Sequence, residues 1–265
     1  MERALPLSQA LTARLSRKPL AIFLDIDGTL VALAPRPDEV VVSPDVLSLV
    51  RDLSRVSDVH VAVVTGRSVP MARKLVPLDH IGVIGNHGFE ILGEDGGMIV
   101  NAEAQRFRPA MSEAAQEIGR VAARHSGLIL EDKIWTLSLH YRLAPRELVP
   151  EVTDAVQRIA AAKGLVTTGG KEIIEVRPPI DVNKGTAAVD LGRRLGALGS
   201  GTALYIGDDR TDEDAFHALR AVDPNAVTVR VGHPGFNGET HAEFGVDSPD
   251  EVRVLLEAVR DSVRR

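Results

Sequence analysis

The chain has 265 residues, of which 44% are hydrophobic and 26% charged, and its formal net charge at pH 7 is −6. These values are typical of a soluble globular protein, and the acidic balance argues against nucleic acid as a partner. The absence of cysteine excludes disulfides and thiolate metal sites. Arginines interrupt the leucines of residues 1–19, and no apolar run approaches membrane-span length. We expect a cytoplasmic monomer without a signal peptide or a membrane segment.

Short apolar runs that end at Gly, Asp or Asn alternate with helical patterns along most of the chain. Helix starts are indicated at Ser43, Ser68 and Lys184. The apolar runs predict buried parallel strands at residues 20–25, 59–66, 81–86, 203–209 and 227–232. This alternation predicts an α/β fold with a doubly wound parallel sheet, whose functional groups lie at the carboxyl ends of the strands.

The middle of the chain departs from this alternation. A polar helix over about 109–125 is followed by strand-like runs, another helix and further strands. We interpret residues 104–180 as an inserted, smaller α+β cap domain, with residues 1–103 and 181–265 forming a Rossmann-like catalytic core.

Two predicted strands of this insertion carry polar strips. In 134–142 the period of two places His140 and Arg142 on one face with Thr136 and Ser138, and in 171–177 it groups Lys171, Glu175 and Arg177. We expect these strips to meet a ligand. The candidate binding residues are His140, Arg142, Lys171 and Glu175. A solvated face with ion pairs such as Lys171 with Glu175 is the alternative.

Acidic residues follow two of the predicted parallel strands. Asp25 and Asp27 end the first strand, and a second cluster from Asp208 to Asp214 ends another. Both clusters belong at the same sheet edge, where carboxylate oxygens suit Mg²⁺. Alone, the first pair could close a turn, and Thr211 with Asp214 matches a capping box. We assign Asp208 to the metal, with Asp212 in support.

Other polar residues follow strands or open helices near this edge. Thr65 precedes Gly66 and Arg67, and Lys184 opens a predicted helix. Each is ordinary by itself, because such a threonine commonly caps a turn and a lone lysine is commonly solvated. Their order along the chain gives them weight. Asn86 and His87, at another strand end, are further candidates for lining a cleft.

The ordered set DxDGT, TGR, lysine and GDD resembles the four motifs of haloacid-dehalogenase-like phosphotransferases, over residues 20 to about 245. The insertion between the second and third motifs is similar to the caps of the sugar-phosphatase subclass. Four stretches resemble trehalose-6-phosphate phosphatases in particular: GNHGFE (85–90), SLHYR (138–142), GKEIIEVRP (170–178) and GDDRTDEDAF (207–216).

The resemblance implies a role for each matching residue. Asp25 is the nucleophile that forms an aspartyl-phosphate, Asp27 the general acid and base, and Thr65 and Lys184 hold the phosphoryl oxygens. Mg²⁺ is bound by the Asp25 carboxylate, the Asp27 carbonyl and the Asp208 carboxylate. The substrate is a small sugar phosphate, trehalose 6-phosphate. Its implied binding residues are Gly66, Arg67, Asn86, His87, His140, Arg142, Lys171 and Glu175.

Three alternatives remain open. The core motifs equally fit phosphatases of sucrose phosphate, glucosyl- or mannosyl-3-phosphoglycerate, or glucosylglycerol phosphate, because specificity lies in the cap. A phosphomutase shares the nucleophile. A non-catalytic phospho-sugar sensor is a third reading, against which Asp27 argues, since a sensor needs no acid–base group beside the nucleophile.

Overall fold

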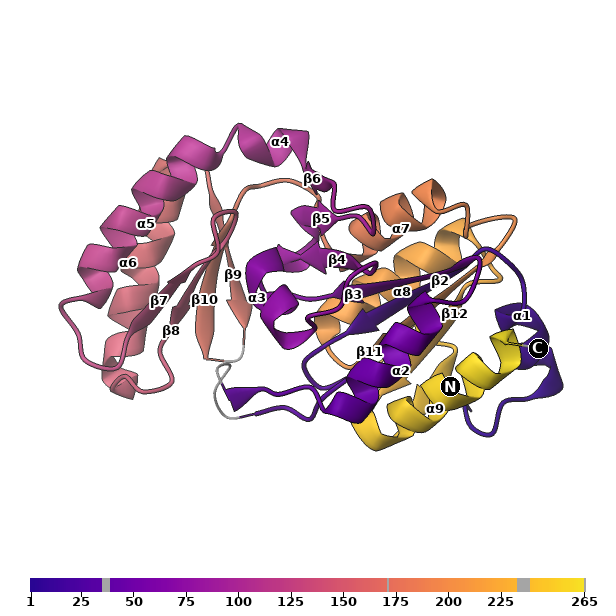
Figure 1. Cartoon of the computed structure of the whole chain (residues 1–265). Coiled ribbons are helices and arrows are strands. Elements are labelled where there is room, and N and C mark those ends of the chain that lie inside the picture. Colours follow the sequence, from indigo (N-terminus) through magenta and orange to yellow (C-terminus); the bar gives the residue numbers. More distant parts are fainter. Residues whose placement is uncertain (35–38, 171, 233–238, 265) are drawn as a thin grey trace. The chain divides into compact units, whose positions relative to one another are not determined.

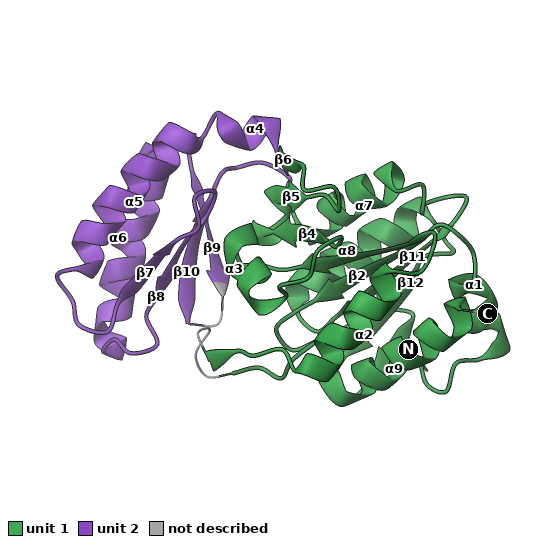
Figure 2. Ribbon diagram, viewed as in Figure 1, with its two compact units in different colours: residues 1–99, 182–265 green, residues 100–181 purple. Residues whose placement is uncertain are grey.

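The computed structural model describes residues 1–34, 39–170, 172–232 and 239–264. These residues form two compact units, a core of residues 1–99 and 182–265 and an inserted unit of residues 100–181 (Figure 2). The insertion begins at residue 100 rather than 104, because the short helix α4 (Ala102–Gln105) already belongs to it. Within the described residues, no helix is both long enough and apolar enough to cross a bilayer.

The core is built on a nine-stranded sheet of order β1-β13-β12-β11-β2-β3-β4-β5-β6 (Figure 1). From β1 to β4 neighbouring strands run parallel, and β5 pairs antiparallel with β4. All residues of β2 and β11 are buried, as expected for central strands of a parallel sheet. The strands are β1 (Glu2–Arg3), β2 (Leu20–Asp25), β3 (Val59–Val64), β4 (Gly82–Gly85), β5 (Glu90–Leu92), β6 (Met98–Val100), β11 (Thr202–Gly207), β12 (Val227–Val231) and β13 (Phe244–Val246).

Helices cover both faces of this sheet. On one face, Ile22 and Leu24 of β2 pack with α1 (Gln9–Leu15), α2 (Pro44–Ser54), α3 (Val69–Leu75) and α9 (Pro249–Val263). On the other, Ala21 and Phe23 pack with α7 (Lys184–Arg194) and α8 (Arg210–Val222). Alternate residues of a strand point to opposite faces, so one strand anchors both layers. The predicted doubly wound α/β fold is confirmed.

The inserted unit has a four-stranded antiparallel sheet of order β7-β8-β10-β9. Its strands are β7 (Ile129–Asp132), β8 (Leu137–His140), β9 (Val166–Gly170) and β10 (Ile173–Arg177). One face of this sheet packs on α5 (Arg108–Ala122) and α6 (Val149–Ala162), which follows the 3₁₀ turn η3 (Arg146–Leu148). Leu137 and Leu139 of β8 lie in this second hydrophobic core.

The strand expected at 134–142 is shorter in the structure. Ile134 has a φ of 74° and its backbone N–H donates to the Asp132 carboxylate at 2.8 Å, so a turn precedes β8. Such a backbone cannot continue a strand. At its other end β8 stops at His140, so Arg142 lies beyond the strand rather than within it.

Candidate active site

The carboxyl ends of three adjacent strands bring the sequence motifs together. In the order β11-β2-β3, Asp208 follows β11, Asp25 ends β2 and Thr65 follows β3. Parallel strands end at the same edge of a sheet, so residues distant in sequence become neighbours there. Oxygens of Asp25, Asp208 and Asp212 all lie within 4.8 Å of one another.

Lys184 links the nucleophile candidate to the second acidic cluster. It is the first residue of α7, and its side chain is 2% exposed. Its Nζ donates to Asp25 Oδ1 at 2.7 Å and to Asp212 Oδ1 at 2.9 Å. Asn183 caps α7 in a capping box with Thr186, which fixes the start of the helix and hence the lysine. A buried ammonium flanked by two carboxylates is a paired charge, as a buried charge requires.

Asp212 is enclosed by four donors. Its Oδ1 accepts from Lys184 and, at 2.8 Å, from the hydroxyl of Tyr205, while its Oδ2 accepts the backbone N–H groups of Asp208 and Asp209 at 3.0 Å each. Helix α8 is capped by Asp209 with Asp212 at its third position. The capping box expected from Thr211 and Asp214 is therefore wrong. The helix begins two residues earlier than that box requires, at Arg210 rather than Asp212, and Asp212 closes the box while also holding Lys184.

The buried carboxylates exceed the buried positive charge at this edge. Burial raises the pKa of Asp25 well above its usual range, which Lys184 opposes and the neighbouring aspartates reinforce. Burial, with the charge of Asp212, raises the pKa of Asp208 to about 7, and burial raises that of Asp212 to about 6 against the effect of Lys184. The pKa of Lys184 is itself raised, because the charges of Asp212 and Asp25 outweigh its desolvation. The cluster is short of positive charge.

This shortage fits a cation. Asp208 Oδ1 is buried and has no hydrogen-bond partner among the described residues, and such an oxygen suits a metal ligand. Asp212 is less suited to bind a metal directly, since both of its oxygens already accept two hydrogen bonds. Asp25 and Asp208 are therefore the carboxylates of this edge that can hold a divalent ion.

Gly28 leaves the space that the Asp208 carboxylate occupies. Its φ is +89°, and a Cβ at this position would come 2.1 to 2.6 Å from all three carboxylate atoms of Asp208. The glycine of the first motif is thus required both by its backbone conformation and by the approach of the second acidic cluster.

Asp27 has a different environment from Asp25. Its Oδ2 and Oδ1 accept from Arg67 Nε and Nη2, each at 2.7 Å, in a bidentate ion pair. The Arg67 side chain is 11% and the Asp27 side chain 31% exposed. Arg67 was expected to bind substrate, and its guanidinium lies on the acid–base candidate Asp27. That partner was not predicted from the sequence.

The Thr65 motif is held by the loop that follows β4. Thr65 is buried, and its Oγ1 accepts the backbone N–H of Arg67 at 3.1 Å. Asn86 and His87, in the 3₁₀ turn η2 (Asn86–Gly88), both have positive φ values, and the N–H of His87 donates to the Thr65 carbonyl at 3.1 Å. A Cβ on Gly66 would lie 2.4 Å from the His87 ring, so the two turns pack directly.

In the inserted unit, pairing register aligns a polar row across the sheet. Glu131 of β7, Ser138 of β8, Glu175 of β10 and Thr168 of β9 are successive cross-strand partners. His140 Nε2 lies 3.3 Å from Glu131 Oε2. Glu131 was not predicted as a site residue, because residues 129–132 (ILED) show no alternation that would assign it to a face before the strand pairing is known.

The other predicted residues of this unit are spread apart. Arg142 is exposed, and its Nε donates to Glu172 at 2.7 Å, where Arg146 also binds. Glu175 lies in the polar row and accepts from Thr168 at 3.4 Å. Lys171 lies outside the described residues.

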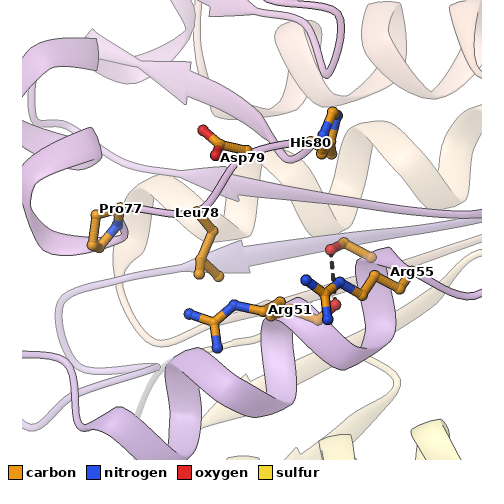
Figure 3. Close-up of a pocket in the computed structure, with 7 residues that line it drawn as sticks. Arg51, Arg55, Pro77, Leu78, Asp79 and His80 are labelled. Carbon is orange, nitrogen blue, oxygen red and sulfur yellow. Dashed lines mark hydrogen bonds between the residues drawn. The ribbon is translucent and has the colours of Figure 1, made fainter.

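A hollow of about 380 Å³ lies elsewhere on the core (Figure 3). It is formed where α2 ends and where the loop before β4 begins, so it belongs to the edge at which the parallel strands start. Carbonyl groups at the end of α2 give this place negative character, which the arginines there offset. The lining residues are Arg51, Ser54, Arg55, Pro77, Leu78, Asp79 and His80.

Comparison with known proteins agrees with this geometry. A family model described as trehalose-phosphatase matches residues 23–250. A trehalose-phosphate phosphatase of Mycobacterium avium is 35% identical over an alignment of 265 positions, which covers 97% of this chain and 67% of that protein. An uncharacterized glycosyl hydrolase of Mycobacterium tuberculosis is 35% identical over 244 residues, and the chain spans only 18% of its length.

Solved structures give the same result. A trehalose-6-phosphate phosphatase related protein superimposes with a TM-score of 0.77 at 33% identity, covering 91% of this chain and 97% of the other. The C-terminal domain of Candida albicans trehalose-6-phosphate phosphatase shares the fold, with a TM-score of 0.77 at 21% identity and 98% of each chain covered. The chain belongs to the trehalose-phosphatase family.

Proposed function

We propose that this chain hydrolyses trehalose 6-phosphate to trehalose and inorganic phosphate, through a phosphate ester formed on Asp25. The observation that carries the proposal is the Asp25–Lys184–Asp212 cluster at the sheet edge, together with Asp208 Oδ1, which has no hydrogen-bond partner in the part of the chain that the structure describes. Family membership supports the substrate. The proposal includes a monomeric cytoplasmic enzyme, which size-exclusion chromatography and cell fractionation test.

In the first step a carboxylate oxygen of Asp25 bonds to phosphorus and the bond to the sugar oxygen breaks. Asp27 gives its proton to that oxygen, and Arg67 orients the Asp27 carboxyl through the bidentate contact. In the second step Asp27 takes a proton from water, whose oxygen bonds to phosphorus as the bond to Asp25 breaks. One group thus serves as acid and then as base.

Lys184 and Thr65 provide fixed positive charge and a hydroxyl donor for the phosphoryl oxygens. Lys184 is already held at 2.7 Å from Asp25, so little reorganisation accompanies the reaction. Thr65 accepts the Arg67 N–H with its oxygen and keeps its own proton for a ligand. Asp25 and Asp208 would hold Mg²⁺, which offsets the repulsion between an anionic nucleophile and an anionic phosphate.

For sugar recognition we propose the polar row of the inserted unit, Glu131 and Glu175 with His140 beside them. Carboxylates and an imidazole suit the hydroxyl groups of a disaccharide. Arg142 and Lys171 remain further candidates for binding the sugar, of which Lys171 lies outside the described residues. The inserted unit would then act as a specificity cap.

The test is phosphate release with Mg²⁺ and with chelator from trehalose 6-phosphate, sucrose 6-phosphate, glucosyl-3-phosphoglycerate and glucose 6-phosphate. We expect preference for trehalose 6-phosphate, loss of turnover with chelator, and no turnover by Asp25→Asn. The matched control is Asp190→Asn, because the Asp190 side chain is half-exposed and its ion pair among the described residues is with Arg194 of the same helix. Turnover of another compound would overturn the substrate and keep the chemistry, whereas no turnover of any would favour a sensor.

A further inference from the structure

The hydroxyl of Tyr205 is buried in an otherwise apolar setting. Tyr205 lies on β11 with no exposed surface, and its ring contacts those of Phe23 and Phe216 at centroid distances of 6.2 and 5.6 Å. A phenylalanine would fill this space equally well. A buried hydroxyl has a desolvation cost that only a hydrogen bond offsets, so the oxygen needs its own explanation.

Its partner is the carboxylate that organises the active site. The Tyr205 hydroxyl donates to Asp212 Oδ1 at 2.8 Å, on the same oxygen that accepts Lys184 Nζ at 2.9 Å. Lys184 in turn donates to Asp25 at 2.7 Å. The remaining Asp212 oxygen fixes the backbone amides of Asp208 and Asp209. A change at Tyr205 would therefore reach both the lysine and the Asp208 loop through one carboxylate.

We propose that Tyr205 is a positioning residue for phosphoryl transfer, which sets the orientation of Asp212 and thereby the place of the Lys184 ammonium and the Asp208 backbone. In this proposal Tyr205 acts through its hydrogen bond to Asp212 and not on the reacting groups. Without the hydroxyl, Asp212 Oδ1 keeps a single donor, and the carboxylate is drawn toward Lys184. The ammonium then shifts from Asp25, and the Asp208 and Asp209 amides lose their alignment.

The inference rests on the proposed chemistry at Asp25 and not on the identity of the sugar. Lys184 acts on the phosphoryl group, and its misplacement affects the chemical step more than binding of the sugar. Loss of one hydrogen bond to a charged group therefore reduces kcat about tenfold or more, with KM changed less than about twofold.

The experiment compares Tyr205→Phe with Tyr141→Phe, which removes the hydroxyl of the other tyrosine, in the core of the inserted unit. Steady-state kinetics at saturating Mg²⁺ are measured with trehalose 6-phosphate and with p-nitrophenyl phosphate. Amide NMR spectra report the Asp208 and Asp209 backbone. We expect a fall in kcat and shifted amide signals for Tyr205→Phe only.

An unchanged kcat in Tyr205→Phe, an equal fall in both variants, or unmoved Asp208 and Asp209 amides would overturn the inference. The two substrates distinguish a failure of this inference from a failure of the proposed function. If wild-type protein ignores trehalose 6-phosphate but cleaves p-nitrophenyl phosphate, the comparison is made on that compound. If it cleaves neither, the amide shifts decide alone.

Discussion

Replacing Gly28 by alanine tests whether the first motif shapes the metal site. Two effects are expected. The φ of +89° disfavours any residue with a Cβ, by about 1–2 kcal/mol. The added carbon would also lie 2.1 Å from Asp208 Oδ2, so the carboxylate must move away.

Gly96→Ala separates these effects. Gly96 has a similar φ of +82° and nothing within 4 Å of an added Cβ, so it carries the backbone cost without the clash. We expect the positive φ to cost each variant about 1–2 kcal/mol of unfolding free energy, and Gly28→Ala to lose more than Gly96→Ala because of the contact with Asp208. Only Gly28→Ala should require more Mg²⁺, with the half-maximal concentration raised about tenfold or more, as for a displaced ligand.

The assay is phosphate release across a Mg²⁺ titration, with chemical denaturation for stability. Equal Mg²⁺ requirements in the two variants would refute the reasoning, because the contact between Gly28 and Asp208 would then have no bearing on the metal. A Gly28→Ala protein that is inactive at every Mg²⁺ concentration but folded would place the damage at the nucleophile.

Further predictions concern the same acidic cluster and the ion pairs that Glu243 makes with Arg14 and Arg220. Asp27→Asn keeps its size but loses the proton, so turnover should fall by about 10² or more in the phosphate assay. Lys184→Met leaves two buried carboxylates without their cation and should lower the unfolding free energy by about 3–5 kcal/mol by denaturation. Mg²⁺ affinity by calorimetry should rise between pH 6 and 8, because Asp208, with a pKa of about 7, must lose its proton to bind. Burial alone would raise the pKa of Glu243, but Arg14 and Arg220 hold it below its ordinary value. The stability that Glu243 contributes over Glu243→Gln is thus present above about pH 4.5 and lost as pH falls further, in denaturation curves from pH 6 to 3.

The sequence predicted those features of the fold that depend on neighbouring residues alone, such as buried strands and helix starts. Apolar runs that stop at acidic residues predicted β2 and β11, because strands buried on both faces need continuous apolar side chains. Parallel pairing then placed Asp25 and Asp208 at one edge, and Ser43 and Ser68 preceded helices as expected. These features need no knowledge of distant contacts.

Contacts between distant residues were not predictable in this way. The Arg67 side chain could serve a substrate or a protein group, and only the folded chain reveals Asp27 as its partner, 40 positions away. Likewise the polar row of Glu131, Ser138 and Glu175 depends on the register of three strands. A shift of one residue in either pairing would turn one carboxylate to the opposite face.

The acidic segment after β11 shows why a single assignment for each residue is too simple. Asp209 caps α8, Asp212 closes that cap and holds Lys184, and Asp208 is left with an unpartnered buried oxygen. A capping carboxylate is stabilised by the helix N-terminus and needs no metal. Among the described residues, the backbone N–H of Asp208 donates to Asp212 and its carbonyl accepts from Arg230 at 2.8 Å, while its Oδ1 has no hydrogen-bond partner. The protein therefore fixes the main chain of Asp208 and leaves a carboxylate oxygen able to bind a cation. This is the arrangement that a metal ligand requires.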